Sequence, residues 1–175
     1  QGATGAAGGG GGGGSGSVTL LGSVASSAAK QGGTAMPYPC RCCNGQNPMR
    51  FLNGILVCDV CDLPEAMNGR FSAVLCSEAL EHVARPWEAL PALREVLRPD
   101  GWIIVTTLTS FPLHAFPDDF WRFTESGLRL LLTDAGFRNV TTAGGGRVDY
   151  LLNDHGEDGM TTMSCPMHVF GVAQC

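Results

Sequence analysis

FSAVLCSEALEHV, residues 71–83, is the stretch that decides the fold of this chain. It begins with an apolar run of strand length, Ala73–Cys76, and passes without glycine or proline into a cluster that holds Glu78, Glu81 and His82. A strand that is apolar on both faces is typical of the interior of a parallel sheet, where helices cover both sides. Open α/β sheets bind ligands at the carboxyl ends of their strands, and the two acids and the histidine follow this end.

The residues after this stretch predict a helix and a second buried strand. The helix is expected from Pro86 to about Leu97, with Pro91 tolerable only in its first turn, where amide donors are unpaired anyway. RPDG at 98–101 indicates a turn, and WIIVTT at 102–107 indicates the strand. A strand, a helix and a strand of these lengths form a βαβ unit with parallel strands and a right-handed crossover.

The last third of the chain predicts a loop, a helix and two more strands. The loop, 108–123, is rich in aromatic residues and prolines, and it leaves the carboxyl end of the second strand. Thr124 is expected to cap the helix, and Gly136 to end it. A strand at 140–143 is followed by a polar loop from Gly144 onward. The closing strand, 168–173, is connected by a loop, which allows an antiparallel partner.

The chain before residue 71 divides into two parts by composition. Residues 1–35 are almost all Gly, Ala, Ser and Thr, which predicts a disordered tail, although SVTLLGSVA at 17–25 is prone to form a strand. A connector with cysteines follows at 36–54, and the α/β domain is expected at 55–175. Asn53-Gly54 is a strong hairpin signal, and the strand after it, ILVCDV, reaches Asp59.

Charge and hydropathy exclude several classes of function. A net charge of -5 means that the chain lacks the excess of basic residues typical of non-specific nucleic-acid binding, so a nucleic-acid partner is not expected. No window holds 18 consecutive apolar residues, so no membrane span is expected. No basic and apolar leader is visible after Gln1, which favours a cytoplasmic location. The absence of Asp and Glu from residues 1–58 leaves an organellar location as the alternative.

The cysteines allow a zinc site as a minor alternative to free thiols. Two Cys-x-x-Cys pairs, separated by fourteen residues, can present four thiolates tetrahedrally to zinc. This separation is one residue short of the usual window, and no secretory signal favours disulfides. The four candidate ligands are Cys40, Cys43, Cys58 and Cys61.

Five segments of the chain together resemble a known family. They are DVCDLP at 59–64, RFSAVLCSEALEHV at 70–83, LRPDGWIIVTT at 97–107, FTESGLRLLLTDAGF at 123–137 and HVFGVAQC at 168–175. In this order they resemble the later two thirds of a class I S-adenosylmethionine-dependent methyltransferase, and are most similar to the methyltransferase type 11 domain. The resemblance covers about residues 55–175. It implies a partial Rossmann-like sheet of parallel strands with a C-terminal antiparallel strand, S-adenosylmethionine as cofactor and a small-molecule acceptor.

The resemblance also implies roles for individual residues. Asp59 would lie beside the adenine of the cofactor, and Cys76, Ser77 and Glu78 would line its sulfonium end. His82 is a candidate base, because imidazole titrates in a useful range, or it stabilises the turn after the strand. The loop at 108–123 would cover the acceptor, and its candidate contacts are His114, Trp121 and Phe123, of which the aromatic pair is explained equally well by packing.

The acidic run after the strand allows a metal site as a further alternative. If a helical turn starts after Cys76, Glu78, Glu81 and His82 share one face and can hold a hard divalent ion. Small-RNA 2'-O-methyltransferases and ubiquinone-pathway O-methyltransferases have a similar run with another histidine, whose place His114 could take. A solvated acidic turn is the simpler interpretation.

The chain departs from the family pattern at its beginning. The family starts with a strand, an acid and a Gly-x-Gly-x-Gly turn, but Gly8–Gly14 follows no apolar strand and Gly144–Gly146 comes too late. A second ribose-binding acid is missing. The organising strand then has an open edge, which 17–25 or a partner chain would have to cover. Two alternative functions follow: a catalytically degenerate methyltransferase-like binding subunit, or a zinc-stabilised interaction module at 36–62.

Overall fold

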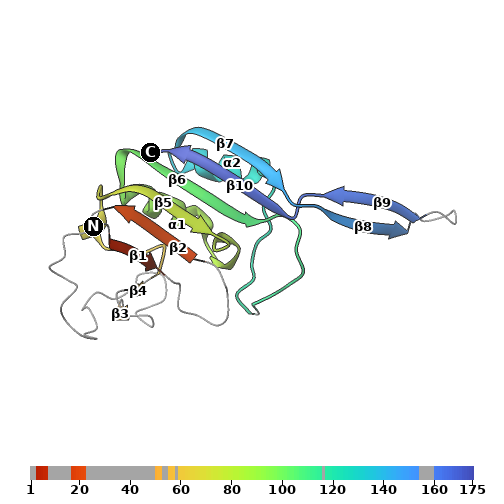
Figure 1. The fold of residues 1–175 in the computed structure, drawn as a ribbon, viewed down its shortest axis with the longest axis horizontal. Coiled ribbons are helices and arrows are strands. Elements are labelled where there is room, and N and C mark those ends of the chain that lie inside the picture. The colour runs from red at the N-terminus through yellow and green to blue at the C-terminus, as the bar shows by residue number, and fades with distance from the viewer. Residues whose placement is uncertain are drawn as a thin grey trace.

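A computed structural model describes residues 3–7, 17–22, 50–52, 55–57, 59–115, 117–153 and 160–175. These residues form a six-stranded sheet, two helices and two separate two-stranded hairpins (Figure 1). In chain order the elements are β1 (Ala3–Ala7), β2 (Ser17–Gly22), β3 (Arg50–Leu52), β4 (Ile55–Val57), the 3-10 turn η2 (Glu65–Met67), β5 (Phe71–Ser77), the 3-10 turn η3 (Leu80–His82), α1 (Pro86–Glu95), β6 (Leu97–Leu108), α2 (Glu125–Asp134), β7 (Arg138–Gly145), β8 (Val148–Asn153), β9 (Met160–Cys165) and β10 (His168–Gln174).

The large sheet confirms the predicted α/β architecture. Its strand order is β1-β2-β5-β6-β10-β7, so β5 lies in the interior of the sheet. β5 and β6 are parallel and are connected through α1, as the βαβ pattern predicts. β10 is antiparallel to both β6 and β7, which confirms the C-terminal antiparallel strand.

The segment predicted to be a disordered tail contributes two strands to this sheet. β2 pairs antiparallel with β5, from Ser17 opposite Ser77 to Gly22 opposite Phe71, and β1 pairs antiparallel with β2. The open edge of β5 is therefore covered from within the chain, as the β-prone run at 17–25 allowed. The physical reason is that an unpaired strand edge gains backbone hydrogen bonds from any β-prone segment within reach.

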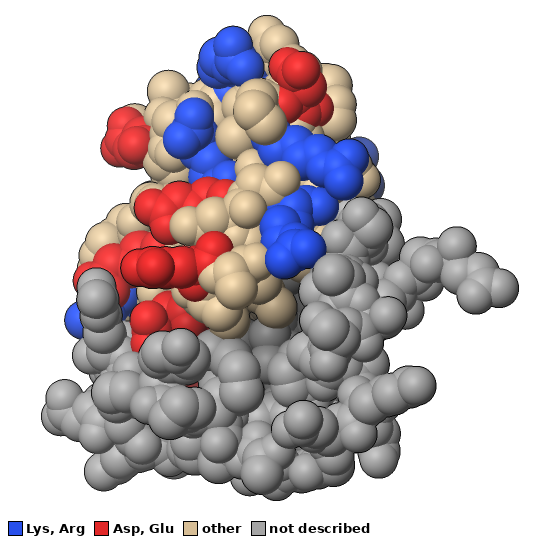
Figure 2. Space-filling view, turned by 90° about the vertical axis from the view of Figure 1, so that its left-hand side faces the viewer, with Lys and Arg blue, Asp and Glu red and all other residues tan. Residues whose placement is uncertain are grey.

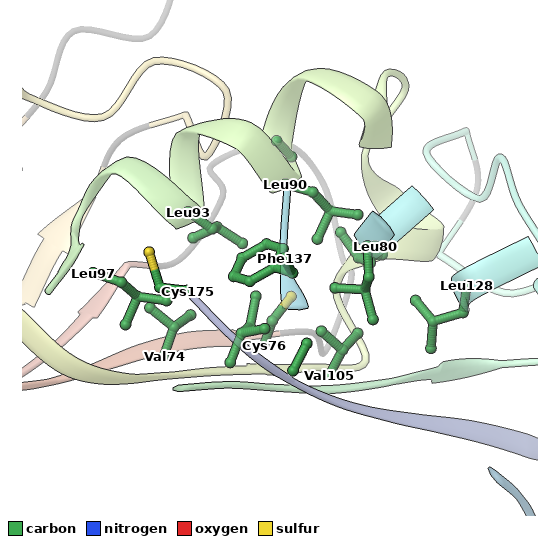
Figure 3. Close-up of a cluster of buried hydrophobic side chains, with 14 of the residues drawn as sticks. Val74, Cys76, Leu80, Leu90, Leu93, Leu97, Val105, Leu128, Phe137 and Cys175 are labelled. Atoms are coloured by element: carbon green, nitrogen blue, oxygen red, sulfur yellow. The ribbon is translucent and has the colours of Figure 1, made fainter. Parts of the chain in front are cut away.

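The hydrophobic core lies between one face of the sheet and the two helices. Val74 and Cys76 of β5 rise from the sheet toward Leu90 and Leu93 of α1 (Figure 3). The alternate residues of each strand point the other way, because successive strand residues face opposite sides. On that face Trp102, Ile104, Phe170 and Val172 are exposed. Helices on both sides were expected, but in the described part of the chain they cover one side.

Three local features differ from the sequence-based expectations. Pro91 lies in the second turn of α1, because Pro86 occupies the first helical position. RPDG is not a separate turn but belongs to β6, where the pairing passes from Leu97 opposite Phe71 to Trp102 opposite Ala73. The polar loop after β7 contains strands β8 and β9, which form an arm that extends from the sheet (Figure 1).

Both helices of the described part are ten residues long, which is too short to cross a bilayer.

Thr124 caps α2 by accepting a hydrogen bond from Gly127 N–H at 3.0 Å, and Gly136 ends it with a φ of +87°, as expected. The side of the molecule shown in Figure 2 carries both Arg side chains and Asp and Glu side chains.

Candidate active site

The candidate site lies at the sheet edge formed by the carboxyl ends of β5 and β6. Ser77 at the end of β5 pairs with Thr106 of β6, and Leu108 at the end of β6 pairs with His168 at the start of β10. His168 also pairs with Gly145 at the end of β7. The segments 78–85 and 109–124 leave the sheet here, so both sets of candidate residues reach one edge, as predicted for an open α/β sheet.

Glu81 is a fully buried carboxyl group with one free oxygen. Its Oε2 accepts a hydrogen bond from the Thr107 hydroxyl at 2.8 Å. Its Oε1 is buried and has no partner among the described residues. Burial raises the pKa of Glu81. An unpaired buried carboxylate oxygen is costly, so this geometry indicates that Oε1 faces a ligand or retains a proton.

Two histidines lie beside the Glu81 carboxylate. His82 Nδ1 lies 2.7 Å from the Asp118 carbonyl, and its Nε2 is buried with no partner among the described residues. The ring of His114 packs edge-on against the ring of His82, with centroids 4.9 Å apart. One ligand atom from each of Glu81, His82 and His114 lies within 4.8 Å of the others. These three side chains form a potential metal-binding cluster, which we call the Glu-His-His cluster.

The loop after β6 is held over this cluster by a partly buried ion pair. Arg122 makes two hydrogen bonds to the Asp119 carboxylate, at 2.6 and 2.8 Å, and Asp119 also accepts the backbone N–H of His114 at 2.9 Å. The guanidinium of Arg122 holds the pKa of Asp119 well below its usual range. The backbone N–H groups of residues 120 and 121 donate to the Glu81 carbonyl. Asp119 therefore fixes the position of His114.

We expect Asp119→Asn to reduce the loss of stability in acid. The folded pKa of Asp119 is lowered, so its stabilising effect is present above the ordinary value of about 3.9 and is lost as pH falls below it. Urea unfolding from about pH 5 to about pH 2 should show a shallower decline for the variant than for the wild type. Asp134→Asn, at the exposed end of α2, is the control and should follow the wild type. Equal slopes for Asp119→Asn and wild type would contradict the assignment.

Glu78 lies apart from the Glu-His-His cluster and pairs with another histidine. Its backbone has a φ of +46°, and its Oε1 lies 3.4 Å from Nδ1 of His168. The ion site allowed as an alternative for Glu78, Glu81 and His82 is arranged differently: His114 lies with Glu81 and His82, and His168 lies against Glu78. The 3-10 turn at 80–82 explains this, because it directs residues 78 and 81 differently from an α-helical turn.

The other candidate cofactor contacts occupy different surroundings. The Cys76 side chain is fully buried in the core, where burial raises its pKa to about 12, so it faces the helices (Figure 3). The Ser77 hydroxyl is hydrogen-bonded to that of Thr106 at 3.0 Å. Asp59 follows β4, which belongs to a separate hairpin, and its Oδ1 accepts the N–H of Cys61 at 2.8 Å.

The aromatic candidates of the loop separate into a surface group and a core group. Trp121 is partly exposed, donates its indole N–H to the Val83 carbonyl at 3.0 Å and packs edge-on against Trp87. Phe123 is buried in the hydrophobic core. The Trp121 side chain is therefore accessible from solvent, whereas Phe123 anchors the end of the loop in the hydrophobic core.

Three cysteines of the zinc alternative, Cys40, Cys43 and Cys58, lie outside the described residues. Cys61 is described, and burial together with the Asp59 carboxylate raises the pKa of its thiol to about 12. The zinc site stays a prediction.

The sheet edge fits a cofactor of the S-adenosylmethionine type. β1 runs parallel to β5, because both are antiparallel to β2, and its carboxyl end at Ala7 pairs with Val18. Val18 pairs in turn with Cys76, so the carboxyl end of β1 lies at the same edge of the sheet as the end of β5. β1 precedes the run Gly8–Gly14 in the chain, although no strand was expected there. The carboxylate of Glu78 at the same edge matches the positive charge of a sulfonium.

The fold and this edge define an α/β domain of the kind that binds a nucleotide-containing ligand at the carboxyl ends of its strands. The family model described as "Methyltransferase domain" matches residues 10–105, starting within the glycine tract. The chain belongs to this methyltransferase family, whose cofactor is S-adenosylmethionine. The cofactor and the fold class implied by the resemblance are thereby confirmed.

Individual proteins are similar to this chain over shorter stretches. The ubiquinone biosynthesis O-methyltransferase of Chromobacterium violaceum is 43% identical over 47 residues, which is 27% of this chain and 20% of that protein. That of Dechloromonas aromatica is 39% identical over 51 residues, 29% of this chain and 22% of that protein. The chain thus spans about a fifth of these relatives. A SAM-dependent methyltransferase from Archaeoglobus fulgidus shares the fold, with a TM-score of 0.52, 14% identity and coverage of 69% and 67% of the two chains.

Three contributors to the site were not predicted from the sequence: Thr107, the pair of Asp119 and Arg122, and His168. Thr107 was read as part of a buried strand, although its hydroxyl binds Glu81. The spacing of Asp119 and Arg122 permits an ion pair, yet nothing in it shows that the pair holds His114. His168 was included in the closing strand without a role. Its position at the start of the closing strand could have indicated its location, because the first residue of an antiparallel strand lies at the carboxyl end of the strand it pairs with.

Proposed function

We propose that this chain is an S-adenosylmethionine-dependent methyltransferase that methylates a hydroxyl group of a small-molecule acceptor. The family membership supports the reaction class, and the two curated O-methyltransferases support oxygen as the acceptor atom. The observation that carries the proposal is the arrangement of Glu78, Glu81, His82 and His114 at the ligand-binding edge of the sheet.

Several residues at the edge have a proposed task. S-adenosylmethionine supplies a methyl group that its positive sulfur already activates, so alignment in a dry pocket is the main task of the protein. Asp59 and Glu78 are the proposed carboxylate contacts of the cofactor, with the backbone of Cys76 and Ser77 beside them. Trp121 is the proposed aromatic contact of the acceptor. A base role for His82 stays a prediction, and its buried Nε2 favours ligand binding over proton exchange with water.

The Glu-His-His cluster is proposed to hold a divalent metal ion. Each member uses one atom for a protein contact: Glu81 Oε2 for Thr107, His82 Nδ1 for the Asp118 carbonyl, and His114 Nδ1 near Asp119. This is the pattern of metal ligands, which are oriented by a second hydrogen bond on the far side. Two imidazoles and one carboxylate favour zinc, cobalt, manganese or iron over magnesium. A bound ion would add positive charge beside the acceptor hydroxyl.

Calorimetry with S-adenosylmethionine is the first test of the proposed function. The full chain should bind the cofactor, and Asp59→Ala should weaken binding at least about 10-fold if its carboxylate holds the adenosine. The matched control is Asp100→Ala, an exposed acid in β6, which should bind like the wild type. Methyl transfer from labelled cofactor to 3,4-dihydroxybenzoate, with and without Mn²⁺, then tests the reaction. No binding at millimolar cofactor would reject the enzyme and leave a non-catalytic subunit.

A further inference from the structure

His168 is a histidine at the sheet edge that the proposed roles do not use. Its Nδ1 lies 3.4 Å from Oε1 of Glu78, and both side chains are 30% exposed. The two nitrogens of an imidazole ring point in different directions. Because Nδ1 of His168 faces the Glu78 carboxylate, its Nε2 points away from Glu78. Among the described histidines of this edge, His82 instead has a buried Nε2.

Glu78 is held in place by an unfavourable backbone conformation. Its φ of +46° lies in the left-handed region, which a side chain with a Cβ rarely adopts. Its backbone N–H donates to the Thr106 carbonyl at 2.8 Å, which ties it to the end of β6. Such residues gather at functional sites, where the surroundings impose the conformation. The backbone of Glu78 is thus tied to the end of β6, and its carboxylate lies against His168.

A cavity lies next to the β7 residue that pairs with His168, because the glycines on either side of Gly145 line it. A β-carbon at Gly146 would stand 3.5 Å from Cδ2 of the His168 ring, so glycine at this position leaves the ring uncovered on that side. A cavity of about 220 Å³ at the base of the β8–β9 arm adjoins this point. Its lining residues are Gly144, Gly146, Arg147, Ser164, Cys165 and Pro166.

We propose that His168 is the general base of the methyl transfer and that Glu78 orients it. This inference rests on the proposed function. His168 Nε2 accepts the proton of the acceptor hydroxyl while the oxygen forms a bond to the methyl carbon. The carbon–sulfur bond breaks and its electron pair stays on sulfur, which becomes a neutral thioether. The proton then passes from His168 to water, and Glu78 stabilises the charged imidazole in between.

Two acceptors that differ in hydroxyl acidity test this role at pH 8. With 3,4-dihydroxybenzoate, whose ring hydroxyls remain protonated, His168→Gln should lower kcat by about 10²- to 10⁴-fold. With 4-nitrocatechol, which is ionised because its nitro group acidifies a hydroxyl, the loss should be below about 10-fold. Glu88→Gln, which breaks the exposed pair between Arg85 and Glu88, is the matched control and should not change either rate.

Each other outcome of this experiment has a definite meaning. Equal losses with both acceptors would show that His168 only ties β10 to β5, and unchanged rates would show that it has no role; either overturns the inference and leaves the proposed function standing. No transfer to either acceptor by the wild type would overturn the proposed function and the inference with it.

A second measurement needs no cofactor. In nitrogen-15 NMR spectra of the neutral imidazole, pairing with Glu78 should place the proton of His168 on Nδ1. Glu78→Ala should shift the population toward the Nε2–H tautomer, whereas Glu88→Ala should leave it unchanged. An identical tautomer in wild type and Glu78→Ala would overturn the orienting role of Glu78.

Discussion

Glu81→Gln is expected to weaken divalent metal binding by roughly 100-fold or more, because the amide removes the negative charge and the anionic oxygen of the Glu-His-His cluster. Glutamine can still accept the hydrogen bond from Thr107, so the fold should persist. Calorimetric titration with Mn²⁺ and Co²⁺ measures the change. Glu88→Gln, an exposed acid, is the control. His114→Asn should also weaken metal binding, because it removes the imidazole ligand that the loop after β6 contributes to the cluster.

The pH dependence of this binding has a definite sign. Burial raises the pKa of Glu81, so an incoming ion displaces a proton and its affinity should increase with pH. Without metal, the unfolded chain loses the Glu81 proton at a lower pH than the folded protein does. Stability should therefore fall as pH rises through the window between the two pKa values, and Glu81→Gln should remove this fall. Metal affinity that is identical in wild type, Glu81→Gln and His114→Asn would reject the site.

Leu132→Ala should lower the free energy of unfolding by about 2–5 kcal/mol. Leu132 of α2 is fully buried and packs against β10. A β-carbon on Gly171 of β10 would stand 3.0 Å from the Leu132 Cδ1. The close packing leaves little room for the surroundings to fill the cavity. In urea unfolding the midpoint should shift strongly, whereas Leu130→Ala, on the exposed side of the same helix, should change stability by less than about 0.5 kcal/mol. Similar losses for both would contradict the assigned core face.

The elements whose signals are local were predicted well. The apolar run at 73–76 is a central strand, the next strand is parallel to it, and Thr124 and Gly136 bound α2 as expected. The position of Pro91 and the inclusion of RPDG in β6 were not predicted, because element boundaries depend on packing and pairing with neighbours. The strand before the glycine tract was missed because its residues, ATGAA, carry no strand pattern.

The candidate site was predicted in its location and only partly in its membership. That acids and histidines would meet at the carboxyl edge followed from their place after β5 and β6. The sequence did not predict which histidine lies beside which acidic residue. Glu78 and Glu81 are three residues apart, yet one faces His168 and the other faces His82 and His114. The 3-10 turn and the positive φ of Glu78 separate them, and neither is visible in the spacing of the residues.

The sequence by itself determined the class of fold, the edge that carries the site and the methyltransferase family, because hydrophobic periodicity and short motifs are properties of neighbouring residues. Only the tertiary structure decided that β2 covers the edge of β5, that Phe123 belongs to the core, and that His168 stands against Glu78. Those facts depend on strand register and loop closure, which bring together residues up to 90 positions apart and leave no pattern in the local sequence.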